Sequence, residues 1–174
     1  EIKETSKAVR ARMVLEELGP TFIKFGQLLS TRVDILPPDY IKELRRLQDQ
    51  VPPLFFSQIK EVIEGELKHP IGLLFEEFDE IPLAAASIGQ AHRAVLPGGE
   101  KVVVKVQRPN IRKIIEVDLA ILSEIAFLID KYTTIGKLYN FKSIVEEFRN
   151  TISNELNFQL EGRNAERFKK NFAQ

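Results

Sequence analysis

The chain has 174 residues, enough for one domain with a real core or for a domain with a helical extension. Its 25 Lys and Arg equal its 25 Asp and Glu, so no global field attracts nucleic acid, which we exclude as a partner. The absence of cysteine excludes disulfide frameworks and thiolate metal sites. His69 and His92 are too few and too far apart in sequence to suggest a zinc site, so no metal site is expected in this chain.

The chain begins at Glu1, with neither an initiator methionine nor a signal sequence, and we expect it to be a piece of a longer protein. The longest apolar stretch, residues 119–129, is interrupted by Glu124 and is far shorter than the roughly 20 residues needed to span a bilayer. We therefore expect no transmembrane span, and a location in the cytoplasm or at the periphery of a membrane.

The first 78 residues show apolar residues at helical spacing, separated by Pro and Gly. The expected helices cover residues 4–18, 20–32, 39–50, 57–67 and 71–78. Ser57 is the expected N-cap of the fourth helix, whose inward residues would be Ile59, Val62, Ile63 and Leu67. No catalytic cluster is evident in this part.

The middle of the chain has the pattern of short strands. Strands are expected at residues 79–83, 90–96 and 101–107, with a tight Pro97-Gly98-Gly99 turn between the last two. A long helix then follows over residues 111–132, a loop over 133–140, and helices over 141–154 and 156–172, bent near Asn157. The apolar stripe expected to be buried on the long helix is Ile114, Ile115, Leu119, Leu122, Ile125, Ala126 and Ile129.

Lys105 lies within a valine run, in the third expected strand, after a loop that contains Ala84, Ala85, Ala86 and Ser87. A lysine there can reach a ligand covered by the preceding loop, which is how a kinase N-lobe binds nucleotide phosphates. The hairpin alone is explained more simply by an exposed lysine that protects an edge strand from aggregation. Both interpretations stay open on this segment by itself.

Four separated blocks of the sequence resemble the N-terminal part of the UbiB-like (ABC1/aarF-type) atypical kinase family, in that family's order. The blocks are LGPTFIKFGQLLSTRVDILPPDYIKELRRLQDQVPP, the alanine-rich loop AAASIGQ, VVVKVQRP, and NELNFQLEGRNAERF. The first contains the family's K-x-G-Q signature as residues 24–27, and the resemblance covers nearly all of the chain from Leu18 onward.

The resemblance implies roles for individual residues. Lys105 would bind phosphate and pair with Glu161 on the kinase C-helix, beneath a loop formed by Ala84, Ala85, Ala86 and Ser87. Lys24 and Gln27 would cross the nucleotide cleft to contact Glu155 of the family's E-x-D motif. Asn157 replaces the usual aspartate of that motif and removes a charge, which weakens any pairing with Lys24 and any metal role there.

The expected fold is α+β with helix dominant: a helical K-x-G-Q extension (1–78) and a truncated kinase-like N-lobe (79–174), with the C-lobe absent. The implied function is the nucleotide-binding part of an atypical kinase or ATPase that supports isoprenoid-quinone (coenzyme Q) or membrane-lipid metabolism. The alternative is a non-catalytic pseudokinase module that binds lipids or partner proteins.

The cofactor implied by the resemblance is ATP or ADP with Mg²⁺, whose metal ligands would come mostly from the absent C-lobe. Alanine in place of glycine over the phosphates implies an altered nucleotide pose, and ATPase or small-molecule chemistry in place of peptide phosphorylation. No catalytic-loop Asp or D-F-G segment is found, so this piece alone is expected to be inactive and to self-associate through its uncovered face. An isoprenoid lipid or a membrane surface is a further expected partner of the longer protein.

Overall fold

The computed structural model describes residues 6–48 and 51–172, which belong to two compact units. Among the described residues, the helical unit comprises residues 6–48 and 112–172, and the sheet unit comprises residues 51–111. This division does not coincide with the boundary expected after residue 78. The helices between residues 56 and 74 belong with the sheet, because their apolar side chains cover one of its faces.

The helical unit begins with α1 (Lys7–Leu18), which Ser6 caps by accepting a hydrogen bond from the Val9 amide. Gly19 then adopts a φ of 102°, a value that favours glycine, and Pro20 occupies the first position of α2. The remaining elements of this unit are α2 (Pro20–Leu29), α3 (Pro38–Leu44), α6 (Ile111–Tyr132), α7 (Thr134–Tyr139), α8 (Phe141–Glu155) and α9 (Phe158–Phe172).

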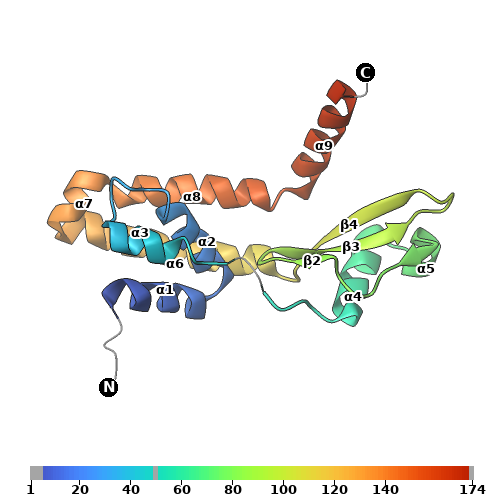
Figure 1. Ribbon diagram of the computed structural model, residues 1–174, viewed down its shortest axis with the longest axis horizontal. Helices are drawn as coiled ribbons and strands as arrows, with labels where there is room; N and C mark the ends of the chain where they lie inside the picture. Colours follow the sequence, from blue (N-terminus) through green and yellow to red (C-terminus); the bar gives the residue numbers. More distant parts are fainter. Residues whose placement is uncertain (1–5, 49–50, 173–174) are drawn as a thin grey trace. The chain divides into compact units, whose positions relative to one another are not determined.

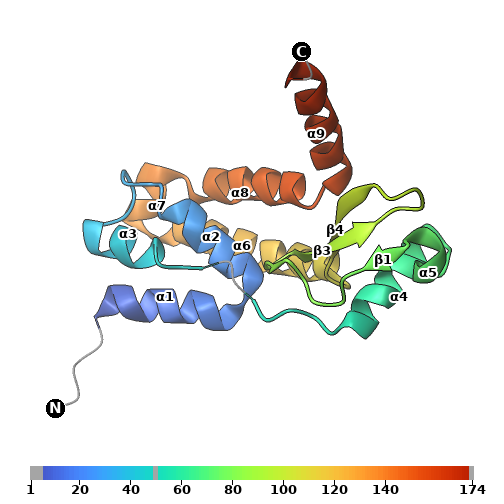
Figure 2. The same cartoon turned by 45° about the vertical axis from the view of Figure 1, so that its right-hand side comes forward.

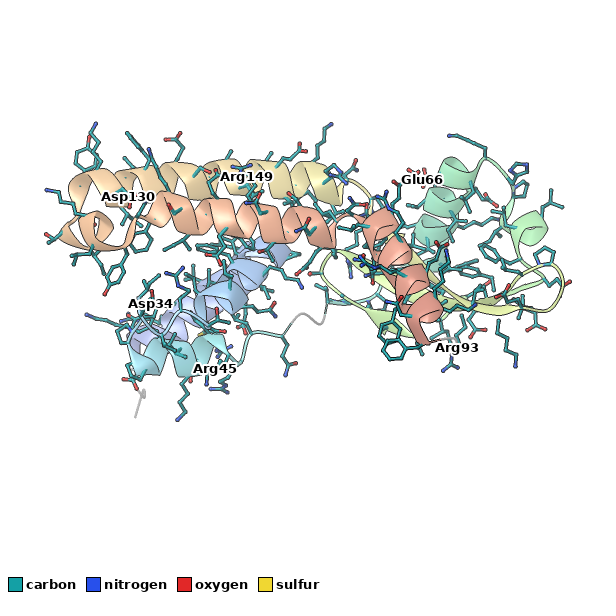
Figure 3. The ribbon with its side chains drawn as sticks, turned by 90° about the horizontal axis from the view of Figure 1, so that it is seen from above. Asp34, Arg45, Glu66, Arg93, Asp130 and Arg149 are labelled. Atoms are coloured by element: carbon teal, nitrogen blue, oxygen red, sulfur yellow. The ribbon has the colours of Figure 1, made fainter. Side chains whose placement is uncertain are left out.

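The core of the helical unit forms where α2, α6 and α8 meet. Phe25 of α2 packs its ring 5.2 Å from that of Phe148, and the buried hydroxyl of Thr21 donates a hydrogen bond to the carboxylate of Asp118 on α6. Figure 3 shows α6 and α8 side by side, with Asp130 and Arg149 labelled. Asp130 accepts the first two amides of α8, and Arg149 donates to Ser123. These bonds fix the N-terminal end and the middle of α8 against α6.

Two elements of the helical unit differ from expectation. The third helix stops at Leu44 instead of Gln50, because tight turns bring Leu47 into the core, where it is 5% exposed; residues 49 and 50 lie outside the described residues. The expected loop over residues 133–140 contains the short helix α7, capped by Thr133. Its Gly136 is buried against the backbone of Ile129 and Asp130, where a Cβ atom would have no room.

The sheet unit is built around β3 (Gly89–Val95), which pairs along its whole length with β4 (Lys101–Gln107). The two strands are joined by the expected turn, in which Gly98 and Gly99 both have positive φ. On the other edge of β3, β1 (Glu77–Phe78) and β2 (Ala84–Ala85) pair with its two ends. Every pairing is antiparallel. Figures 1 and 2 show this sheet with the two helices of the same unit, at residues 56–67 and 71–74.

The strand expected at residues 79–83 is wrong, because this segment separates β1 from β2. The Asp79 and Leu83 amides still donate to β3 carbonyls, but Pro82 has no amide to donate, and Ile81 is 84% exposed. In place of the expected strand, the structure has two short strands that flank residues 79–83 on either side.

The helices α4 (Phe56–Leu67) and α5 (Ile71–Leu74) cover one face of the sheet. The core between them is formed by Ile59, Ile63, Phe75, Ala94 and Val106. The predicted cap Ser57 is wrong: α4 begins one residue earlier, and the ring of Phe56 packs 5.8 Å from that of Phe78. Leu67, expected to face inward, is 50% exposed, and α5 ends at Leu74 because residues 77 and 78 pair with β3.

No helix in the described part of the chain, residues 6–48 and 51–172, is both long enough and apolar enough to cross a membrane.

Candidate functional site

Lys105 projects from the face of the sheet that α4 does not cover. Its neighbour Val106 is buried in the core beneath α4, and adjacent residues of a strand point to opposite faces. The register places Lys105 opposite Ala91, and Ala91 opposite Ala84. Directly paired residues share a face, so the lysine stands in one row with the first alanine of the alanine-rich loop.

Only part of the alanine-rich loop, residues 84–90, is a connection between β2 and β3. Ala84 and Ala85 are the strand β2, and only Ala86, Ser87 and Ile88 form the connection. Ala86 N donates to Gly89 O at 2.8 Å, and Ser87 is 1% exposed. The described residues with positive φ are Gly19, Lys68, Gly98, Gly99, Asn110 and Asn140, none of them in this loop. Alanine is therefore compatible with the backbone that the loop adopts.

Arg108, which was not among the predicted site residues, holds this loop from the end of β4. Its backbone amide donates to Ile88 O at 3.0 Å, its Nε to Ala86 O at 3.0 Å, and its Nη2 to Pro52 O at 2.8 Å. The one feature of the sequence that could have indicated Arg108 was its position three residues after Lys105, where the chain leaves the sheet.

A buried polar pair under the sheet was missed as well. Gln90 is 2% exposed and His92 is fully buried, on the face covered by α4. His92 Nδ1 lies 2.7 Å from Asp79 O, which can only accept, so Nδ1 carries the proton and Nε2 accepts from Gln90 Nε2 at 2.9 Å. Gln90 Oε1 accepts the Leu54 amide at 2.8 Å. These bonds join the segment before α4 to the central strand.

The K-x-G-Q segment lies on α2 in the helical unit. Lys24 Nζ is 3.0 Å from Glu155 Oε2, which is the contact that the resemblance implied. Gln27 instead donates to Leu47 O at 3.2 Å. A cavity of about 120 Å³ lies beside the pair, lined by Lys24, Gln27, Leu28, Phe148, Thr151, Ile152 and Glu155.

Gly26 of the same segment allows α2 to pack closely on its neighbours. A Cβ atom there would lie 2.4 Å from Leu47 Cδ1 and 2.8 Å from Leu15 Cδ1. The glycine at position 26 is therefore explained by the close packing of α1, α2 and the turn after α3.

Asn157 directly precedes α9 and is the second of the two residues that separate this helix from α8. Its Oδ1 accepts the Leu160 amide at 3.0 Å, and its carbonyl accepts the amides of Leu160 and Glu161. The amide side chain thus caps the helix, as an aspartate could. Glu161 lies in the first turn of α9, where the positive end of the helix dipole stabilises a carboxylate.

Lys105 belongs to the sheet unit and Glu161 to the helical unit, so their pairing stays a prediction.

Within the described residues, no group of three or more His, Asp and Glu side chains could hold a metal ion. The Mg²⁺ ligands expected elsewhere in the longer protein stay a prediction too. A nucleotide fits the sheet unit in one respect: an exposed cation stands beside a short loop on the face that α4 does not cover.

Comparison with known proteins gives a consistent picture. Residues 46–174 match the family described as the ABC1 atypical kinase-like domain. A "Probable protein kinase UbiB" of Marinobacter nauticus is 47% identical over 167 residues, which cover 96% of this chain and 30% of that protein. "Protein ACTIVITY OF BC1 COMPLEX KINASE 7, chloroplastic" of Arabidopsis thaliana is 45% identical over 170 residues, covering 98% of this chain and 24% of that protein.

A similar solved structure is that of Rv3197 from Mycobacterium tuberculosis in complex with erythromycin. It is 28% identical with a TM-score of 0.58, covering 91% of this chain and 40% of that one. The chain thus spans about 30% of the length of a UbiB-named relative. It is a member of the ABC1 atypical kinase-like family, as both its sequence and its kinase-like sheet with flanking helices show.

Proposed function

We propose that this chain is the nucleotide-binding portion of an atypical kinase or ATPase, with Lys105 as the ligand of the α- and β-phosphates of ATP or ADP. The observation that carries the proposal is the row Ala84–Ala91–Lys105 on the face of the sheet opposite to α4. It brings an ammonium group and the start of the loop to one surface. Such a group neutralises phosphate charge, which is the main task of a protein that transfers phosphoryl groups.

The proposal extends to Glu161 and to the biological setting. Glu161 would fix the Lys105 ammonium, while the Lys24–Glu155 pair, with Gln27 in the cavity lining beside it, would form a regulatory contact at the nucleotide cleft. The names of the UbiB relatives support a role in isoprenoid-quinone metabolism. The 174-residue fragment would be inactive alone and would self-associate. A strictly monomeric fragment in light scattering would contradict this last expectation.

The test is a thermal-unfolding measurement on the full-length protein with increasing ADP or ATP and Mg²⁺. A nucleotide that binds only the folded state raises the midpoint by an amount that grows with its concentration over Kd. We expect a shift in wild type and a much smaller one in Lys105→Ala. Lys101→Ala is the matched control, since Lys101 is an exposed lysine on the same face of the same strand, at its other end. Equal shifts in all three proteins would reject Lys105 as the phosphate ligand.

A second candidate is a non-catalytic module that binds lipids or partner proteins. It is favoured by Asn157, which stands at the position of an expected acid and uses its side-chain oxygen to cap α9. This candidate predicts no nucleotide shift in wild type, together with binding of the full-length protein to vesicles that contain an isoprenoid lipid.

A further inference from the structure

We propose that Arg108 is a positioning residue that holds the alanine-rich loop in the conformation that can accept a nucleotide phosphate. This inference rests on the proposed nucleotide site at Lys105. It adds Arg108 to that site, as a residue that binds the loop and does not bind the nucleotide.

Two hydrogen bonds of Arg108 engage carbonyl groups of the loop. The backbone amide and the Nε of this residue donate to Ile88 O and Ala86 O, each at 3.0 Å. The carbonyl of Gly89, the first residue of β3, accepts the Ala86 amide at 2.8 Å. Three carbonyl groups in four residues are thus engaged within the sheet unit.

The direction of these carbonyls decides whether a loop can bind an anion. A phosphate is bound by N–H groups and cations, whereas a carbonyl oxygen turned toward it is repelled. A kinase loop rich in glycine can rotate its peptide units freely, but alanine restricts that rotation. The structure fixes the orientation of the peptide units through Arg108 instead.

The same guanidinium also attaches the loop to the segment before α4. Arg108 Nη2 donates to Pro52 O at 2.8 Å, and the Gln90 side chain accepts the Leu54 amide two residues later. Pro52 and Pro53 have no amide hydrogen with which to form such bonds themselves. The half-buried Arg108 therefore connects the loop, the end of β4 and residues 52–54.

A lysine at position 108 separates positioning from charge. Lysine keeps the positive charge and the backbone amide, but its donors all sit on one nitrogen, which cannot replace the Nε and Nη2 that reach Ala86 O and Pro52 O from separate positions of the planar guanidinium. If Arg108 acted by attracting the nucleotide, Arg108→Lys would bind nearly as well as wild type, and Arg108→Gln would not. If it acts by holding the loop, both variants lose affinity.

The experiment compares full-length wild type, Arg108→Lys, Arg108→Gln and the control Arg112→Lys, an exposed arginine four residues further on. Hydrogen exchange of residues 84–90 reports loop order, and titration with ADP and Mg²⁺ gives the Kd. We expect about tenfold faster loop exchange in both Arg108 variants. The Kd should rise about tenfold as well, because the apparent Kd rises as the competent fraction of the loop falls. Arg112→Lys should match wild type in both measurements.

Three results would overturn the inference. Unchanged loop exchange in Arg108→Lys would show that the arginine does not order the loop. Faster loop exchange in the Arg108 variants with an unchanged Kd would show that loop order does not affect nucleotide binding. A Kd raised only in Arg108→Gln would show that the charge of Arg108 matters and that its positioning of the loop does not. If wild type binds no nucleotide, the proposed function itself fails, and faster exchange would leave Arg108 a purely structural residue. Should Arg108→Gln not fold, Arg108→Lys alone decides between these results.

Discussion

Lys24 Nζ lies 3.0 Å from Glu155 Oε2 and joins α2 to the C-terminal end of α8. The lysine side chain is 18% exposed and the glutamate 37%, so the pair is only partly screened by water. The contact unites the K-x-G-Q segment with the glutamate of the E-x-D position inside the helical unit. It therefore has a structural consequence that can be measured without any nucleotide.

A double-mutant cycle with Lys24→Gln and Glu155→Gln measures that consequence. We expect a coupling free energy of about 0.5–1 kcal/mol in urea unfolding, the upper part of the range for ion pairs near the surface. The control cycle uses Lys60 and Glu64, a more exposed pair 3.9 Å apart on α4, with coupling of at most about 0.5 kcal/mol. Equal coupling in the two cycles would show that the contact between α2 and α8 has no special stability.

Gly26 provides a second test of the K-x-G-Q segment. Gly26→Ala would push a Cβ atom against Leu47 and Leu15, and Leu47 is buried with little space to move. Overpacking costs about 1–3 kcal/mol, while alanine gains about 1 kcal/mol of helix propensity, so we expect a net loss of about 1 kcal/mol.

The matched control for this change is Gly65→Ala in α4, where nothing lies within 4 Å of the added Cβ atom. There the propensity gain acts alone, and the free energy of unfolding should rise by about 0.5–1 kcal/mol. If both variants were stabilised equally in urea unfolding, the leucines around Gly26 would have to rearrange without cost.

The elements with a regular pattern were predictable from the sequence. The structure confirms α6 over residues 111–132 and β4 over residues 101–107, because long periodic segments and a valine run with a Gly-Gly turn leave few alternatives. The Lys24–Glu155 contact followed from the family resemblance, since no local pattern brings α2 to α8.

Features that depend on tertiary structure were not predictable. The stripe expected to be buried on α6 is divided: Ile115, Leu119, Leu122 and Ala126 are buried, while Ile114 and Ile125 are 48% and 45% exposed. A helix with apolar residues around most of its circumference does not reveal which face its neighbours cover. Arg108 was missed for a related reason, because its acceptors are backbone carbonyls of distant residues, which carry no signal in the side-chain pattern.

Gln90 should be important for the stability of the sheet unit. Gln90→Leu leaves the Leu54 amide without its acceptor and His92 Nε2 without its donor, in a buried place. We expect the variant to lose about 1–3 kcal/mol of unfolding free energy. Gln58→Leu, at an exposed position of α4, should remain within about 0.5 kcal/mol of wild type. A loss of the same size in both would contradict the role assigned to the buried bonds.

Glu43 should make the stability of the helical unit depend on pH. Its side chain is 13% exposed and accepts hydrogen bonds from Arg12 Nε at 3.1 Å and Arg46 Nη1 at 3.0 Å. Desolvation, the largest single influence, raises the pKa of Glu43, but the hydrogen bonds and charges of Arg46 and Arg12 together outweigh it. The pKa of Glu43 is thereby lowered from its ordinary value of 4.5.

A carboxyl group whose pKa is lower in the folded state stabilises that state above its unfolded pKa, and the gain disappears as the pH falls through the folded pKa. Glu43→Gln should therefore have a lower urea midpoint than wild type at pH 7, and the difference should shrink as the pH is lowered from about 4.5. Glu61→Gln, which changes an exposed glutamate on α4, should follow the wild-type profile throughout. A Glu43→Gln difference that stayed constant down to about pH 2 would show that the variant acts through packing, and that the charge of Glu43 does not stabilise the contact between α1 and α3.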